Sequence, residues 1–283
     1  MISLLCLLIL LGISFLTLLE QKVLGSSQLR KGPFYVGLFG LLQPFSDAVK
    51  LYLISFKVYS NFNNLIINIF CRISLLLSLL LWAVCPIFYF SFFMPLGVMY
   101  VLLILSLSSI PVLLISWFSN CKYSLLGGLR SVSQLVSYEI SSAFCLVSLC
   151  FLSFCLNLFY LNFYSSIISI FFLFIIWVPS LLAERNRTPF DFSEGESELV
   201  SGFNTELGGN PFALLFISEY INLLFISVFT FFFFFLKECY FIMFTCGLFG
   251  LFIILIRSLL PRLRYDKLME ICWKADWSTI VQY

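Results

Sequence analysis

The sequence predicts an all-α fold, a polytopic membrane helix bundle with seven clear transmembrane helices and a short eighth whose crossing is left open. Its composition is 61% hydrophobic and only 11% charged, whereas soluble domains are about 45–50% apolar and about 25% charged. Several apolar runs reach the roughly 20 residues that a membrane-spanning helix needs. They are apolar on every face, which argues against a barrel of alternating strands. We therefore expect residues 1–283 to form a single integral-membrane domain.

The seven predicted spans are the long apolar runs of the chain. In order they cover residues 2–19, 65–93, 95–118, 138–161, 163–183, 212–236 and 240–256. The first run lacks both a basic start and a small-residue cleavage site. We interpret it as a retained span and not as a signal peptide.

Two further helical segments are expected outside these spans. In residues 43–52, Pro44 favours a helix start, and apolar side chains then recur at helical spacing as far as Phe56. This pattern is typical of an amphipathic helix lying in the membrane interface. Residues 268–283 are too short and too charged to cross a membrane easily. They are expected to form at most a short terminal helix.

The distribution of basic residues predicts the orientation of the spans. The first, third, fifth and seventh connections together contain thirteen Lys and Arg residues, whereas the second, fourth and sixth contain only Lys237. By the positive-inside rule, the first group of connections faces the cytoplasm or the mitochondrial matrix. All long polar connections then gather on one face, where a soluble partner can dock.

The residue types exclude several kinds of site. The chain has no histidine, so imidazole-bound haem, histidine-based zinc or copper sites and His-dependent triads are excluded within it. Its ten cysteines form no C-x-x-C pair, which favours their role as small apolar residues of membrane helices. We therefore predict no catalytic residue and no metal site in this chain, and no nucleic-acid partner.

The segment of residues 184–211 is the most acidic part of the chain. It contains six of the fourteen carboxylates and two arginines, between two apolar runs. Composition alone favours a solvated loop. However, aromatic residues alternate with the acids, and Glu139 and Glu219 lie inside neighbouring apolar spans. Because carboxylates buried together cannot all ionise, a chain of them is a candidate proton path.

Several long motifs of this sequence resemble subunit 1 of NADH–ubiquinone oxidoreductase, respiratory complex I. They are residues 18–25, 28–33, 43–51, 122–127, 137–139, 184–191, 194–204, 211–214 and 260–266. The resemblance covers nearly the whole chain in order. It implies a core membrane subunit without a redox centre of its own, which forms the membrane side of the quinone chamber and couples quinone reduction to proton translocation.

The resemblance also implies roles for individual residues. The quinone-chamber positions are Arg30, Asp47, Phe212 and Phe216. The proton-path carboxylates are Glu139, Glu184, Asp191, Glu194, Glu196, Glu198, Glu206 and Glu219. Three departures from the family pattern are Gln21 after the first-span glutamate, Arg185 after Glu184, and the short, charged C-terminal segment.

The same resemblance implies the surroundings of the chain. Its substrate is ubiquinone or a related quinone, while NADH and iron–sulfur clusters belong to partner subunits. Its partners are soluble quinone-module subunits on the matrix side, neighbouring small membrane subunits and the lipid bilayer. The expected location is the mitochondrial inner membrane, with a bacterial plasma membrane as the alternative.

Three other functions remain open at this point. A membrane-bound hydrogenase uses a similar subunit, and partner subunits in the purified complex distinguish it. A stand-alone ion carrier or channel predicts transport by the isolated chain. A purely structural anchor predicts that the acidic residues are passive.

Overall fold

The computed structural model describes residues 2–34, 36–54, 62–84, 96–153, 167–191, 202–205, 207–234 and 239–276. All regular secondary structure in these ranges is helical. The all-α prediction is therefore confirmed for this part of the chain.

Nine α-helices and four short helical turns follow one another along the described ranges. The α-helices are α1 Ile2–Ser27, α2 Gln43–Ile54, α3 Phe62–Leu81, α4 Gly97–Phe118, α5 Lys122–Ser153, α6 Ile167–Glu184, α8 Asn210–Phe234, α9 Cys239–Leu259 and α10 Tyr265–Glu270. The turns are the 3₁₀ segments η1 Leu38–Gly40, η2 Trp82–Val84 and η4 Gly202–Asn204, and the π-helical η5 Ile271–Asp276.

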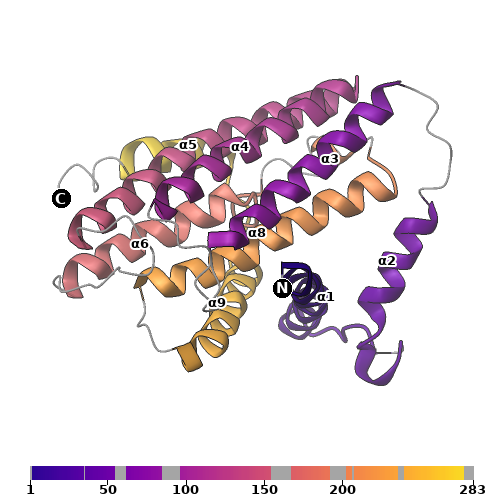
Figure 1. Ribbon diagram of the computed structural model, residues 1–283, viewed down its shortest axis with the longest axis horizontal. Coiled ribbons are helices and arrows are strands. Elements are labelled where there is room, and N and C mark those ends of the chain that lie inside the picture. Colours follow the sequence, from indigo (N-terminus) through magenta and orange to yellow (C-terminus); the bar gives the residue numbers. More distant parts are fainter. Residues whose placement is uncertain are drawn as a thin grey trace.

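The long helices pack side by side in the order α8, α3, α4, α5 and α6, and α6 returns to contact α8. Figure 1 shows these five helices running in similar directions, with α1 seen nearly end-on below them and α2 standing apart at one edge. Helices α1 and α9 contact each other and α8. Helix α8 thus contacts α1, α2, α3, α6 and α9, and it occupies the centre of the bundle.

The largest apolar core lies where α3, α4, α5, α6 and α8 meet. Its fully buried side chains include Leu146 of α5, Trp177 of α6 and Phe225 of α8. Helices α4 and α5 approach closely, because a Cβ atom on Gly128 would lie 2.1 Å from Ser116 Oγ. The glycine therefore serves helix packing and does not end the helix.

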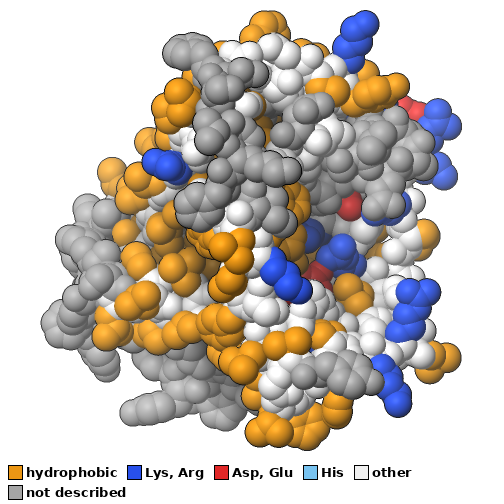
Figure 2. Space-filling view, turned by 90° about the vertical axis from the view of Figure 1, so that its right-hand side faces the viewer, with side chains coloured by type: hydrophobic (Ala, Val, Ile, Leu, Met, Phe, Trp, Pro, Cys, Tyr) orange, Lys and Arg blue, Asp and Glu red, His pale blue; other side chains and the backbone are white. Residues whose placement is uncertain are grey.

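The outer surface carries many exposed leucine, isoleucine and phenylalanine side chains. Figure 2 shows apolar side chains over much of one face, most basic side chains towards one side of it, and acidic side chains recessed between basic ones. An apolar exterior of this extent is expected for helices that contact lipid.

Five of the helical segments are long and apolar enough to cross a membrane. They are Leu4–Ser27, Asn63–Val84, Gly97–Phe118, Lys122–Phe151 and Asn210–Thr230. Two shorter apolar helical segments, Leu173–Glu184 and Gly247–Leu259, lie where the fifth and seventh spans were predicted. The chain is a multi-pass membrane protein, but the described residues do not confirm seven spans. Residues 85–95, 154–166 and 235–238, parts of several predicted spans, lie outside the described ranges.

Two predicted boundaries are wrong. Helix α1 continues to Ser27, so Glu20 lies inside a helix and is only 8% exposed, where a polar connection was expected. Helix α5 begins at Lys122, so most of the predicted third connection is helical. The physical reason in α5 is the close packing at Gly128, which gives this glycine a place in the helix interface.

Helices are found in both of the segments where they were expected outside the spans. Residues 43–54 do form a helix, as the proline and the periodicity predicted. Helix α10 and the turn η5 lie against α5, where the Tyr138 hydroxyl donates a 2.7 Å hydrogen bond to the Leu268 carbonyl. The C-terminal segment therefore contains a short helix, as expected, and this helix packs on α5. Residues 277–283 lie outside the described ranges.

Candidate functional site

Four carboxylates in the described ranges each lie next to an arginine near one end of the bundle. The pairs are Glu184–Arg185 (3.1 Å), Glu219–Arg187 (3.6 Å), Asp191–Arg262 (3.5 Å) and Glu20–Arg257. The pairs join segments that the sequence placed near the first, fifth and seventh connections. The predicted gathering of these connections at one face is therefore found in the structure.

The most enclosed pair ends helix α6. The side chains of Glu184 and Arg185 are 4% and 10% exposed, and Arg185 Nη2 lies 3.1 Å from Glu184 Oε1. Burial lowers the pKa of the Arg185 guanidinium, while the charges of Glu184 and Glu219 act in the opposite direction. The guanidinium stays protonated because the ordinary pKa of arginine is far above neutral pH.

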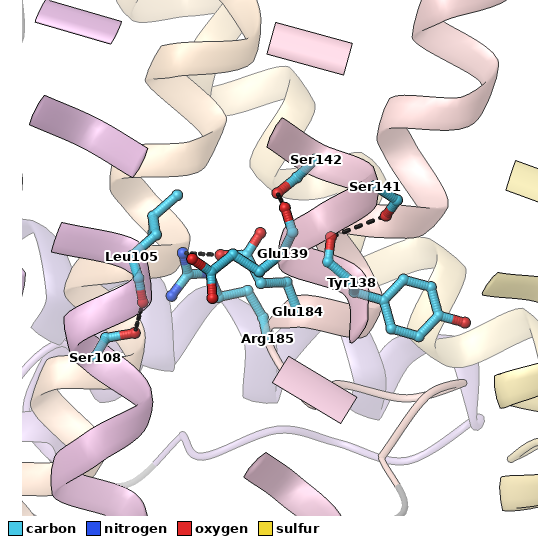
Figure 3. Close-up of polar contacts among 8 residues, drawn as sticks. All are labelled: Leu105, Ser108, Tyr138, Glu139, Ser141, Ser142, Glu184 and Arg185. Carbon is cyan, nitrogen blue, oxygen red and sulfur yellow. Dashed lines mark hydrogen bonds and ion pairs between the residues drawn. The ribbon is translucent and has the colours of Figure 1, made fainter. Parts of the chain in front are cut away.

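Glu139 of α5 approaches this pair from the neighbouring helix. Figure 3 shows Glu139, Glu184 and Arg185 converging between α4 and α5. Glu139 is half-buried, and its side chain is directed at the Glu184–Arg185 pair (Figure 3). The structure therefore brings together two of the predicted path carboxylates.

The turn after α6 is held by a buried glutamine. Gln134 Nε2 of α5 donates 2.8 Å hydrogen bonds to the carbonyl oxygens of Ala183 and Phe190. The Leu263 amide donates to the Pro189 carbonyl at 2.9 Å. These bonds fix the backbone on both sides of Arg185 and Arg187, so both arginine side chains project from a turn that is held in place.

A second polar cluster connects α1, α8 and α9. The Glu20 carboxylate accepts hydrogen bonds from the Tyr220 hydroxyl and from the Arg257 guanidinium. The Arg187 guanidinium lies over the Tyr220 ring, 4.6 Å from its centroid, in cation–π geometry. Arg187 therefore links the Glu20 cluster with Glu219.

Three aromatic rings follow one face of α8. Phe212 and Phe216 stack with centroids 5.9 Å apart, and Phe216 contacts Tyr220 at 4.7 Å. The Arg187 guanidinium also lies 6.0 Å from the Phe216 centroid. The two phenylalanines predicted as quinone-chamber positions thus lead directly to the charged clusters.

The other predicted positions are less connected. Arg30 is exposed in the turn after α1, and Asp47 of α2 accepts a 3.0 Å hydrogen bond from Gln43. Helix α2 contacts α8. Among the contacts found for the described residues, none joins Arg30 or Asp47 to the clusters above. Glu194, Glu196, Glu198 and Glu206 lie outside the described ranges.

Two small hollows adjoin the arginines. One, between α6, α8 and α9, is lined by Arg185, Arg187 and apolar side chains, and the other by Glu20, Thr188 and Arg257 among others. Each has a volume of about 10 Å³, close to the space that one water molecule occupies. In the described ranges, no group of three or more His, Cys, Asp or Glu residues could hold a metal ion.

Known proteins with similar sequences belong to the family that the sequence motifs resemble. The sequence profile described as NADH dehydrogenase matches residues 1–280. The chain belongs to the NADH dehydrogenase family.

Relatives in this family cover most of the chain. The chain is 48% identical to NADH-ubiquinone oxidoreductase chain 1 of Aedes aegypti over 276 residues, which is 94% of this chain and 87% of the relative. It is 44% identical to the protein of the same name from Apis mellifera ligustica over 285 residues, covering 99% and 93%. The protein of that name from Heterololigo bleekeri is 44% identical over 284 residues, covering 95% and 90%.

Six residues of the charged clusters were not predicted from the sequence as part of the site. They are Glu20, Gln134, Arg187, Tyr220, Arg257 and Arg262. The basic residues were counted only for orientation. Each buried acid needs a cation nearby, so the arginines of the same connections were the available signal. Gln134 and Tyr220 had no such signal, because a polar residue in an apolar run does not reveal its partner.

Proposed function

We propose that this chain is the core membrane subunit of a proton-pumping NADH:ubiquinone oxidoreductase, located in the mitochondrial inner membrane. It forms the membrane side of the quinone chamber and begins the buried carboxylate path that couples quinone reduction to proton translocation. The relatives in the family carry the name of chain 1 of this enzyme. The substrate is ubiquinone or a related quinone, and NADH and iron–sulfur clusters reside in partner subunits.

The observation that carries the proposal is the succession of Glu139, Glu184 and Glu219 on α5, α6 and α8, with arginines set between them. Acids within apolar helices are costly and are retained for function. Through Arg187 this succession reaches Phe216 and Phe212. A charge change at a quinone beside these rings would therefore act on Arg187 and then on Glu219.

The same proposal assigns the remaining positions. Arg30 and Asp47 lie near the chamber entrance, and Asp191, Glu194, Glu196, Glu198 and Glu206 connect the chamber to the path. The polar face docks the soluble quinone-module subunits, while small membrane subunits and lipid cover the apolar faces. Helices α6 and α9 cross the membrane together with the five candidate spans given above, which makes seven spans.

The test is neutralisation of Glu139 or Glu219 in the assembled complex. We expect Glu139→Gln and Glu219→Gln to lower quinone-coupled turnover about tenfold or more, which corresponds to a barrier increase of about 1.4 kcal/mol. Electron entry from NADH to an artificial acceptor should be unchanged, because it does not use the membrane path. Glu270→Gln, at an exposed carboxylate, is the matched control. Full coupled turnover in an assembled Glu139→Gln complex would refute the path.

A further inference from the structure

The charges of the site do not balance one to one. Five carboxylates of the described ranges lie in or beside the clusters, and four arginines accompany them. The carboxylates are Glu20, Glu139, Glu184, Asp191 and Glu219; the arginines are Arg185, Arg187, Arg257 and Arg262. Each of these five carboxylates except Glu139 lies within 4 Å of an arginine among the described residues. Glu139 is therefore the acid without a cation of its own.

The nearest cation to Glu139 along α6 is incompletely used. Arg185 contacts Glu184 through one nitrogen and one oxygen. Within the described part of the chain, the buried atoms Arg185 Nε and Glu184 Oε2 have no hydrogen-bond partner. A guanidinium has five N–H donors in a planar fork, and a carboxylate usually receives two of them. Half of this pair is thus available to another group.

The geometry of the pair also makes it exchangeable. Residues adjacent in a helix do not face each other, and Arg185 meets Glu184 only because α6 ends between them. Figure 3 shows the side chain of Glu139 directed at this pair from α5. The same guanidinium can therefore serve carboxylates on two different helices with a change of side-chain torsions alone.

Electrostatics limits the number of ionised groups. Two carboxylates and one guanidinium share a largely buried site, where like charges and desolvation prevent both acids from ionising at once. Glu219 of α8 also faces Arg185, but it has Arg187 as its own counter-ion. The three groups are neutral together when one of the two carboxyl groups is protonated and the other is ionised.

We propose that Arg185 is an exchangeable counter-ion that pairs with Glu184 in the present arrangement and with Glu139 in a second one. In the present arrangement Glu139 carries the proton. In the exchange the O–H bond of Glu139 breaks, an O–H bond forms at Glu184 Oε2, and the guanidinium moves to Glu139. No electron is transferred, and the net charge of the three groups stays zero. A role of this exchange in proton translocation rests on the proposed function. The sharing of one proton and one counter-ion between Glu139 and Glu184 does not.

The test reads the protonation of each carboxyl without using activity. An apolar carbodiimide reacts with protonated carboxyl groups, and mass spectrometry of this subunit from the intact complex locates the label. We expect label on Glu139 and little on Glu184 in the unaltered complex. In Arg185→Gln both should be labelled, since neither has a cation. Arg185→Lys keeps the charge and should retain the unaltered pattern.

The decisive variant is Glu184→Gln. It releases Arg185 to pair with Glu139, which favours the ionised form of Glu139, so labelling of Glu139 should fall severalfold. Glu270, an exposed carboxylate that pairs with Lys274 away from this site, should keep its low labelling throughout and serves as the internal control. Unchanged labelling of Glu139 in Glu184→Gln, or of Glu184 in Arg185→Gln, would overturn the proposal. If Glu139→Gln leaves coupled turnover intact while these labelling changes occur, the proposed function fails and the counter-ion exchange stands.

Discussion

Four ion pairs lie at the inner end of the bundle, where Glu20, Glu184, Asp191 and Glu219 each meet an arginine, and two lie at its C-terminal edge, at Asp266 and Glu270. Each inner pair has one partner that is at most 14% exposed, whereas both partners of each outer pair are mostly exposed. At the inner end, the side chain of Arg187 is 14% exposed where it meets Glu219. At the C-terminal edge, Lys274 is 75% exposed beside Glu270, and Arg264 is 79% exposed beside Asp266. The inner pairs other than Glu184–Arg185 join residues far apart in the chain, whereas the outer pairs are local.

This difference teaches where the charges of a membrane protein have consequences. The two charges of an exposed ion pair are hydrated in the folded and in the unfolded protein, so the pair contributes little to stability. A buried charge that loses its partner has no water to replace it, so the loss is large. We therefore expect the effect of removing a cation to follow the burial of the pair, so that Arg187→Met costs the most, Arg257→Met less and Lys274→Met least.

The largest effect is expected for Arg187→Met. It removes the Arg187–Glu219 ion pair and takes the guanidinium away from the Tyr220 ring. Breaking a buried pair costs about 3–5 kcal/mol, and the partial exposure of Glu219 reduces this to about 2–3 kcal/mol. The measurement is the temperature at which the assembled complex loses this subunit. Arg187→Lys keeps the positive charge and should lose clearly less. Equal losses in the two variants would show that packing, and not charge, is responsible.

A smaller effect is expected for Arg257→Met. The Glu20 carboxylate keeps the Tyr220 hydroxyl as a donor, and the Arg257 side chain is already 31% exposed. We expect a loss of about 1–2 kcal/mol, between the values for buried and for exposed pairs. Heat inactivation of quinone reductase activity in the intact complex measures it.

The double variant Glu20→Gln with Arg257→Met isolates the pair itself. The neutral glutamine needs no counter-ion, so the second substitution should recover part of the stability that Arg257→Met loses. Additive losses from the two substitutions would mean that the charges of Glu20 and Arg257 do not interact.

Much of the fold followed from sequence because apolar length and periodicity are local properties. The residues of α4 and α2 show this, since Pro44 and the run before Phe118 were enough to predict both helices. Helix α5 was predicted to start too late, because only the neighbouring helix reveals that Gly128 packs against Ser116. Glu139, Glu184 and Glu219 were recognised because acids in apolar runs are unusual.

The partners of these acids could not be predicted in the same way. Glu20 and Arg257 are separated by most of the chain, and nothing at either position selects the other. Gln134 likewise fixes the turn of Arg185 and Arg187 through hydrogen bonds to backbone atoms, which any sequence offers. Sequence therefore indicates which side chains need a partner, while the helix packing decides which partner they receive.

The smallest effect is expected for Lys274→Met at the exposed edge. Lys274 lowers the pKa of Glu270 through a hydrogen bond and its charge. A lowered pKa in the folded state stabilises the protein above the ordinary pKa of the carboxyl, and this contribution disappears as the pH falls through the lowered value. Any difference between Lys274→Met and the unaltered complex should thus be confined to pH values above the acid range. Because water screens both groups, we expect the dissociation temperature at neutral pH to be the same within error. A loss as large as that of Arg257→Met would show that exposure does not determine the importance of these ion pairs.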